Sequence, residues 1–220
     1  MHKFRFKFSK TGRAAYISHL DTMRTFQRAI ARAKLPAKHT EGFNPHAYIS
    51  IALPLSLGYT SECEYLDLIL LELLPEDEII SRMNAVLPDG IRLLGAYEQK
   101  MKTKEIGAAR FAITMEYDNG CADAIVSEVN TFLNADSIVV LKKSKRGEVE
   151  TDIAPMIRNI SVSSDENTIR LDATLAAGNT VSLNPDYLIR AIERYIPKCA
   201  PDFTEFHRIE VLCENGNVFC

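Results

Sequence analysis

Residues 16–57 have the sequence YISHLDTMRTFQRAIARAKLPAKHTEGFNPHAYISIALPLSL, which predicts a helix, a turn-rich loop and a strand in that order. Ser18 is a typical helix N-cap, and Asp21 follows three positions later, where a carboxylate favours the positive end of the helix dipole. Pro36 cannot continue a helix, so we expect the helix to end before it. Apolar residues recur between these limits at helical spacing, at Leu20, Met23, Phe26, Ile30 and Ala33.

Strands and helices alternate on both sides of this stretch. Alternating or β-rich patterns predict strands at residues 3–8, 48–53, 64–73 and 91–98, and a second helix is predicted at 75–86. The order strand, helix, strand, strand, helix, strand is that of a ferredoxin-like (βαββαβ) half. We therefore expect a first domain, with a basic surface, at residues 1–100.

The same order of elements recurs after a polar segment at residues 99–109, which we interpret as a linker. Residues 142–165 are too long for a hairpin turn and predict an inserted loop or an extra strand pair. The fold class is thus predicted as α+β, with two tandem ferredoxin-like halves and a second domain at residues 108–220. Its strands are predicted at 110–117, 137–143, 169–175 and 205–212, and its helices at 122–133 and 185–195.

Positive charge is concentrated at the start of the chain. Residues 1–50 contain ten Lys or Arg against two acidic residues, a balance of +8, so the remainder carries −11 within a total of −3. Arg24, Arg28 and Arg32 are four residues apart and lie on one line of the predicted helix. Guanidinium groups in such a row can bind phosphates, so we interpret the row as an RNA-binding or partner-binding surface. The alternative is a solvated basic face.

Two other basic elements are candidates to extend this surface. One is the basic face of the first predicted strand, if that face is open, with Lys3, Arg5 and Lys7. The other is the KKSKRG run at residues 142–147, in which Lys143 and Arg146 are candidate phosphate contacts.

The loop that follows the basic helix is a candidate contact for substrate or partner. Gly42, Phe43 and Asn44 offer main-chain donors and an aromatic ring that can stack on a base. The alternative is a tight turn with Phe43 packed inward.

Histidines cluster in the same region. His19 at the helix start and His46 in the loop are candidate general acid or base groups, which would suit metal-independent RNA cleavage. The alternative for His19 is a local capping or packing role. We expect no metal site, because His39 and His46 lie in a loop whose path the sequence does not define and no cysteine joins them.

Other patterns exclude whole classes of function. The five cysteines contain no C-x-x-C pair and no three-Cys cluster, so we expect no iron–sulfur centre and no cofactor in this chain. No Walker-type loop, G-x-G-x-x-G or nucleophile elbow is present, so nucleotide hydrolysis and serine hydrolase chemistry have no support in the sequence. The N-terminus is unlike a signal peptide and no apolar run has membrane-spanning length, so we expect a cytoplasmic protein with no membrane contact.

Several short motifs occur together in this chain: His19-Leu20-Asp21, Arg24 with Arg28 and Ala29, the GFNPH loop, Pro54-Leu55 with Gly58, and Ser61 with Glu64. In this combination the chain resembles the radical-SAM-linked bacterial domain of unknown function. The resemblance covers the first half closely and, through SKRG and DIAP, the second half more weakly. Where many relatives have a basic residue shortly after the Asn-Pro pair, this chain has Ala47-Tyr48, which weakens any phosphate contact assigned to the loop. The resemblance implies association with a radical SAM enzyme, on which the cluster cysteines would lie.

These patterns lead to one hypothesis and two alternatives. The hypothesis is a non-catalytic RNA-binding or substrate-presenting accessory protein to a radical SAM enzyme, acting in tRNA or rRNA modification. One alternative is a metal-independent endoribonuclease that uses His19, by fold-level analogy with tandem ferredoxin-like CRISPR ribonucleases. The other is a protein–protein scaffold whose basic face binds an acidic partner.

Overall fold

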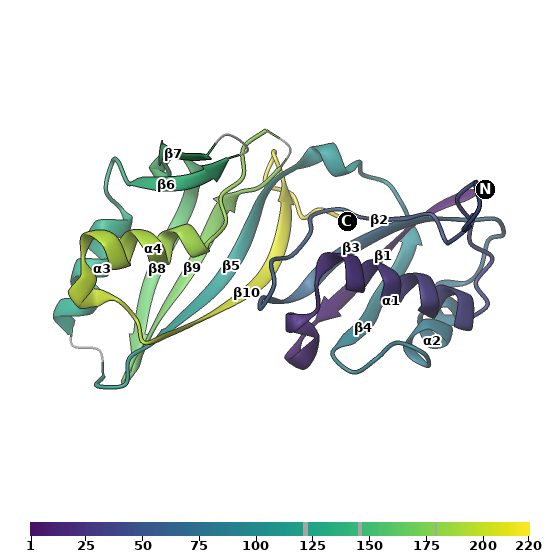
Figure 1. Cartoon of the computed structure of the whole chain (residues 1–220), viewed down its shortest axis with the longest axis horizontal. Helices are drawn as coiled ribbons and strands as arrows, with labels where there is room; N and C mark the ends of the chain where they lie inside the picture. The colour runs from purple at the N-terminus through teal and green to yellow at the C-terminus, as the bar shows by residue number, and fades with distance from the viewer. Residues whose placement is uncertain (121–122, 145–146, 179) are drawn as a thin grey trace. The chain divides into compact units, whose positions relative to one another are not determined.

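The structure is a computed structural model that describes residues 1–120, 123–144, 147–178 and 180–220. It is a mixed α+β fold in which the described residues form four α-helices (Figure 1). The chain divides into two compact units: unit 1 contains Met1–Glu105 and Val218–Cys220, and unit 2 contains Ile106–Asn217. Among the helices in these residues, none combines the length and the apolar character that crossing a membrane requires.

Unit 1 is built on an antiparallel sheet. The order across the sheet is β4-β1-β3-β2, and every neighbouring pair is antiparallel. A 3-10 turn, η1 (Gly12–Tyr16), and α1 (His19–Arg32) connect β1 to β2, while α2 (Glu76–Asn84) connects β3 to β4. The strands, in chain order, are β1 (His2–Lys10), β2 (Ile49–Ile51), β3 (Thr60–Leu70) and β4 (Ile91–Glu98).

Helix α1 packs its apolar face on this sheet. The ring of Phe26 meets that of Phe8 on β1 edge-on, with the centroids 4.6 Å apart. The buried core of unit 1 continues through Ile30 and, on β3, Leu66. Leu20, which the helical spacing assigns to this face, is 64% exposed, because the buried face of α1 begins only at Thr22.

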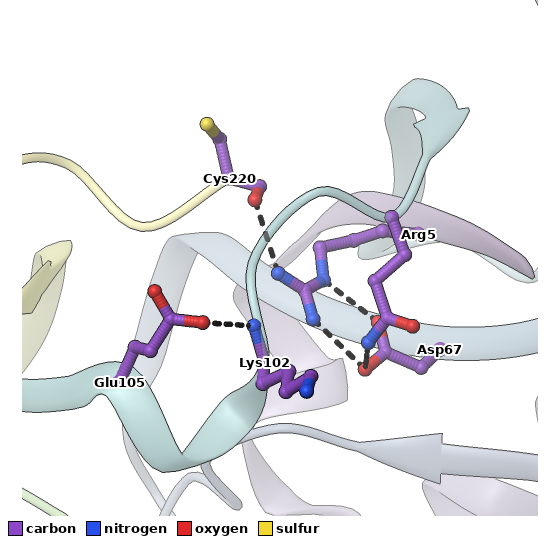
Figure 2. Close-up of polar contacts among 6 residues, drawn as sticks. Arg5, Asp67, Lys102, Glu105 and Cys220 are labelled. Carbon is purple, nitrogen blue, oxygen red and sulfur yellow. Dashed lines mark hydrogen bonds and ion pairs between the residues drawn. The ribbon is translucent and has the colours of Figure 1, made fainter.

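Arg5 corrects the expectation of an open basic face on the first strand. Its guanidinium is fully buried and donates to both carboxylate oxygens of Asp67 on β3, at 2.7 and 2.9 Å, and to the main-chain oxygen of Cys220 at 3.0 Å (Figure 2). The ring of Phe219 lies 4.1 Å from the guanidinium carbon. Arg5 therefore holds residues 218–220 on unit 1 and adds nothing to a binding surface. Of its two neighbours on that face, Lys3 is exposed and Lys7 is half-buried.

The C-terminal end of α1 has a left-handed residue that is not glycine. Lys34 has a φ of 53°. Its N–H donates to Ala31 O at 3.1 Å, and the N–H of Leu35 donates to Ile30 O at 3.1 Å, which together form a Schellman motif. Leu35 and Ile30 are both buried, as the apolar contact of this motif requires. The helix thus ends at Arg32 through its own hydrogen bonds, four residues before Pro36.

Within unit 2, antiparallel strands pair in the order β10-β5-β9-β8. Its helices are α3 (Asp123–Leu133) and α4 (Asp186–Tyr195), which meet where the rings of Phe132 and Tyr195 lie 5.9 Å apart. Short 3-10 turns are present at η2 (Thr103–Glu105, in unit 1), η3 (Ala154–Met156) and η4 (Pro197–Cys199). The sheet strands are β5 (Ile106–Glu116), β8 (Ile157–Asp165), β9 (Thr168–Ala176) and β10 (Phe203–Cys213).

The strand predicted at residues 137–143 is not part of this sheet. It corresponds to β6 (Val139–Ser144), which pairs with β7 (Gly147–Asp152) in a separate two-stranded sheet. The sheet instead takes β8 from the segment that we expected to be inserted. The sequence of β8, IRNISVSSD, has few apolar residues and is mostly exposed, because β8 is the last strand in the order and packs along one neighbour, β9.

The segment predicted as a linker, residues 99–109, ends inside a strand. β5 begins at Ile106, and its first residues pair with β9 and β10. Ile106, Ala108 and Ala109 are buried there. Gly107, Ala108 and Ala109 have at most a methyl side chain and do not produce the periodic apolar pattern from which a strand is predicted, so the start at Ile106 was not predicted.

Candidate nucleic-acid interface

The predicted arginine row lies on the exposed face of α1. Arg24, Arg28 and Arg32 are all exposed. Arg24 Nη1 donates to Asp21 Oδ1 at 3.2 Å, whereas neither Arg28 nor Arg32 pairs with a carboxylate in the part of the chain that the structure describes. Arg32 Nε reaches only the main-chain oxygen of Arg28, at 3.5 Å. Two of these guanidinium groups are thus available for an anion.

Asp21 organises the start of the same helix. Its N–H donates to Ser18 Oγ at 3.1 Å, and Ser18 Oγ donates to Asp21 Oδ2 at 2.7 Å, which fixes the predicted N-cap. The hydrogen bond from Ser18, followed by that from Arg24, lowers the pKa of the Asp21 carboxyl below its ordinary value. The carboxylate stays charged at neutral pH and holds Arg24, so Arg24 is the least available of the three arginines.

The loop after α1 is an ordered hairpin, which we call the 38–48 finger. Tyr48 N–H donates to Lys38 O at 2.8 Å, and Thr40 N–H donates to His46 O at 2.8 Å. An antiparallel bridge joins His39 to Ala47 between these two bonds. Backbone hydrogen bonds therefore close the finger from its base to near its tip.

Both ends of the finger are fixed to β3. On the incoming side, Ala37 bridges Leu70 and Lys38 N–H donates to Ile69 O at 2.8 Å. On the outgoing side, Ile49 of β2 pairs with Leu68. The residues before and after the finger thus pair with the same strand, β3, and this pairing fixes where the finger begins and ends.

The candidate residues Gly42, Phe43 and Asn44 form the tip of the finger. Gly42 has a φ of 120°, which favours glycine, and all three residues are exposed. The Phe43 side chain has 111% of the reference exposure, so it makes no packing contact within the chain. The alternative of a tight turn with Phe43 packed inward is wrong.

His46 is held by the finger itself. The ring Nδ1 of His46 lies 3.1 Å from Asn44 O and 3.3 Å from Thr40 Oγ1. The main-chain N–H of His46 donates to Thr40 Oγ1 at 3.2 Å. These contacts give His46 a structural role at the base of the tip. They do not require a catalytic one.

His19 lies at the other end of α1, beside a small pocket. It is the first residue of the helix, it is exposed, and it lines the pocket together with Lys10, Thr22 and Glu64, among others. Lys10 and Glu64 are almost fully buried, and Lys10 Nζ donates to Ile17 O at 3.0 Å. His46 is not among the residues that line this pocket.

Sequence reasoning missed Lys10 as a site residue and singled out Glu64 only within a motif. Lys10 lies at the end of a basic alternating strand, where a lysine is ordinarily solvent-exposed. Glu64 lies inside β3, between Cys63 and Tyr65, and an acidic side chain between these two residues was the available signal. Burial of both next to His19 depends on pairing between β1 and β3, in which Glu64 stands opposite Phe8.

The remaining candidates lie in unit 2. Lys143 is exposed on β6, and its N–H donates to Tyr187 Oη at 3.2 Å. The neighbouring Lys142 Nζ donates to Ser182 O at 2.6 Å. Arg146 lies outside the described residues. Across the residues that are described, no group of three or more His, Cys, Asp or Glu side chains is placed to hold a metal ion.

Comparisons with known proteins give one informative match. The family model described as "Uncharacterized protein conserved in bacteria (DUF2344)" matches residues 3–185. None of the curated proteins matches the chain. Among solved structures, the "Crystal Structure of an Unknown Protein from Galdieria sulphuraria" is similar at 10% identity over 94% of this chain and 98% of that chain, with a TM-score of 0.27, too low to bear on the fold.

Proposed function

This chain belongs to DUF2344, a family of uncharacterised proteins conserved in bacteria, and we propose that it binds RNA and presents it to a radical SAM enzyme, as an accessory protein in tRNA or rRNA modification. The observation that carries the RNA-binding proposal is the row of exposed arginines on α1. Arg28 and Arg32 have no carboxylate partner among the described residues, so binding a phosphate would not first require breaking an ion pair. Lys143 and Arg146 of unit 2 are proposed as additional phosphate contacts.

The radical SAM partner is proposed from the motif combination in residues 16–64 alone. The scattered cysteines agree with it, because Cys63, Cys199 and Cys213 are buried. A cluster would therefore be held by the partner, with this chain supplying RNA to it in the cytoplasm.

The proposal also includes a tandem ferredoxin-like organisation. The strand orders β4-β1-β3-β2 and β10-β5-β9-β8 agree with it. When the strands of each unit are numbered along the chain and the β6–β7 pair is left out, both orders are fourth, first, third, second. A repeated ion pair supports it further. Arg110 follows Arg5 by 105 residues, Asp172 follows Asp67 by the same 105, and each pair is bidentate through Nε and Nη2.

The experiment is RNA binding by the purified chain across a salt series, with bulk tRNA and rRNA. Affinity for several phosphates falls steeply with salt, and the double variant Arg24→Ala with Arg28→Ala should bind more weakly and lower the log–log slope by about 0.7 per lost contact on single strands. Arg92→Ala is the matched control, because Arg92 is exposed on β4 of the same unit and pairs with no described carboxylate. If the double variant binds as tightly as the wild type at low salt, α1 is not the RNA surface.

A second candidate function is metal-independent RNA cleavage by His19. The observation in its favour is that exposed His19 shares a pocket with buried Lys10 and Glu64, so an imidazole and two ionisable groups lie together. The same incubations reveal cleavage, and loss of cleavage in His19→Ala with binding retained would promote this candidate. If the chain binds no RNA at all, both RNA functions are ruled out and the protein–protein scaffold is the remaining hypothesis.

A further inference from the structure

Phe43 is an exposed aromatic at the tip of an ordered element. The folded chain gains no burial energy from it, since the side chain is fully exposed. Large aromatic side chains at exposed tips are characteristic of contact sites, where their burial contributes to binding. The position of Phe43 therefore needs an explanation outside the chain's own packing.

The finger that carries Phe43 is organised before any ligand arrives. Its two ends are fixed to β3, at Ala37 and at Ile49, and its arms are joined by the Thr40–His46 and Tyr48–Lys38 hydrogen bonds. His46 in turn contacts Asn44 O, directly beside Phe43. A ligand that meets Phe43 would thus lose little free energy in ordering the loop.

Positive charge lies where the finger leaves α1. Arg32 and Lys34 are exposed, Lys38 at the base of the finger is half-buried, and none of the three pairs with a carboxylate in the residues described. Lys34 occupies a left-handed position, with a φ of 53°, at which glycine is the usual residue. The chain thus keeps a cation at a conformationally costly position beside the finger.

We propose that the 38–48 finger binds unpaired nucleotides of RNA, with the Phe43 ring at its tip stacked on a base and with Arg32 and Lys34, near its base, on phosphates of the same strand. This inference rests on the proposed RNA-binding function and specifies its substrate class as single strands, loops or bulges. In an A-form duplex the base faces are stacked and only edges and backbone are accessible, so an aromatic tip has no face to stack on. An unpaired base offers that face, whatever its identity.

The test compares two RNAs of equal length, one fully paired and one with a loop of unpaired nucleotides. Phe43→Ala should weaken binding of the looped RNA about tenfold and leave binding of the paired RNA unchanged. The salt slope should stay the same, because no charge is removed. Phe43→Tyr should retain binding, since its ring still stacks, whereas Phe43→Leu should lose it, because it is apolar without a π face. Placing 2-aminopurine in the loop adds a direct readout, as its fluorescence is quenched on stacking with wild-type protein and not with Phe43→Ala.

Lys34→Gly tests the charge at the base of the finger without risk of unfolding. We expect this variant to bind the looped RNA more weakly while its thermal midpoint rises, since glycine relieves the left-handed backbone. A loss of affinity together with a gain in stability would not arise from damage to the fold.

The outcomes separate this inference from the proposed function. If Phe43→Ala binds both RNAs like the wild type, while the Arg24→Ala, Arg28→Ala double variant loses both, the finger does not read unpaired bases and the RNA surface is α1 alone. Equal losses on paired and looped RNA would also overturn the stacking proposal. A wild-type chain that binds neither RNA would overturn the proposed function, and this inference with it.

Discussion

Arg5 on β1 and Asp67 on the neighbouring strand β3 form a bidentate ion pair, and the guanidinium of Arg5 is fully buried. Arg110 and Asp172 make the same pair in unit 2, at 2.8 and 2.6 Å, but there the side chains are 43% and 38% exposed. The two pairs share their bidentate geometry and differ in solvent access, and the buried pair has two further hydrogen bonds, from Gln99 Nε2 to Asp67 at 2.8 Å and from Arg5 to Cys220 O. They therefore allow the effect of burial to be measured within one protein.

We predict that Asp67→Ala lowers the free energy of unfolding by about 3 kcal/mol, because it leaves a buried guanidinium without its carboxylate. Asp172→Ala, the matched control, should cost less than about 1 kcal/mol, since solvent screens that pair. Urea unfolding of both variants measures the difference. Equal losses would mean that burial of Arg5 does not set the contribution of its pair.

Phe219 should hold the end of the chain on unit 1. It is fully buried, it lies under the Arg5 guanidinium, and its ring meets that of Tyr65 edge-on with centroids 5.3 Å apart. We expect Phe219→Ala to destabilise the protein by about 3 kcal/mol, as for other buried phenylalanines. Phe43→Ala removes the same atoms from an exposed position and should change stability by less than about 0.5 kcal/mol. A small effect at residue 219 would show that residues 218–220 do not contribute to unit 1.

Lys34→Gly should raise the free energy of unfolding by about 1 kcal/mol, because a side chain at a left-handed position is strained by roughly that amount. Ala33→Gly provides the contrast. Ala33 has a φ of −70° at the C-cap, where glycine adds only freedom to the unfolded chain, so this variant should be less stable. Thermal and urea unfolding of both variants measure these changes. If the free energy of unfolding changes in the same direction in both variants, the prediction is wrong.

Asp152 makes stability depend on pH. Its Oδ1 accepts hydrogen bonds from Ile138 N–H at 2.9 Å and Ala154 N–H at 3.0 Å, and these bonds lower the pKa of the carboxyl below its ordinary value. A carboxyl whose pKa is lower in the folded state stabilises the protein above its unfolded pKa of about 3.9, and this contribution is lost as the pH falls through the folded pKa.

The stability difference between the wild type and Asp152→Asn should therefore be largest near neutral pH and should shrink on acidification below about pH 4. Urea unfolding between pH 7 and pH 2.5 measures it. The exposed Asp136, for which the described residues provide no hydrogen-bond partner, supplies Asp136→Asn as the control, with little change at any pH. A difference at residue 152 that does not vary with pH would assign the effect to packing.

The sequence predicted α1 closely because its signals are local. The cap at Ser18 and the breaker at Pro36 lie within the helix or next to it, and the structure has a helix at His19–Arg32 with the predicted cap. The Schellman ending at Lys34 was not predicted, because glycine rather than lysine marks that position.

Strand pairing in unit 2 was less accessible to sequence reasoning. β6 has the apolar start VVL that marks a strand, yet it belongs to the separate pair with β7. β8 is mostly exposed, so little periodicity distinguishes it from a loop. Which strand joins a sheet depends on partners far along the chain, and the local pattern does not contain them.

The sequence by itself determined which segments are helices and strands in unit 1, the helix face that carries Arg24, Arg28 and Arg32, and the turn-forming character of the GFNPH loop. Each follows from spacing along a few neighbouring residues. Only the tertiary structure decided that Arg5 is buried on Asp67, that Lys10 and Glu64 line one pocket with His19, and that Phe43 is fully exposed on a finger fixed to β3. These features depend on which strands pair and which side chains a distant segment covers, and burial, unlike periodicity, is a property of the assembled fold.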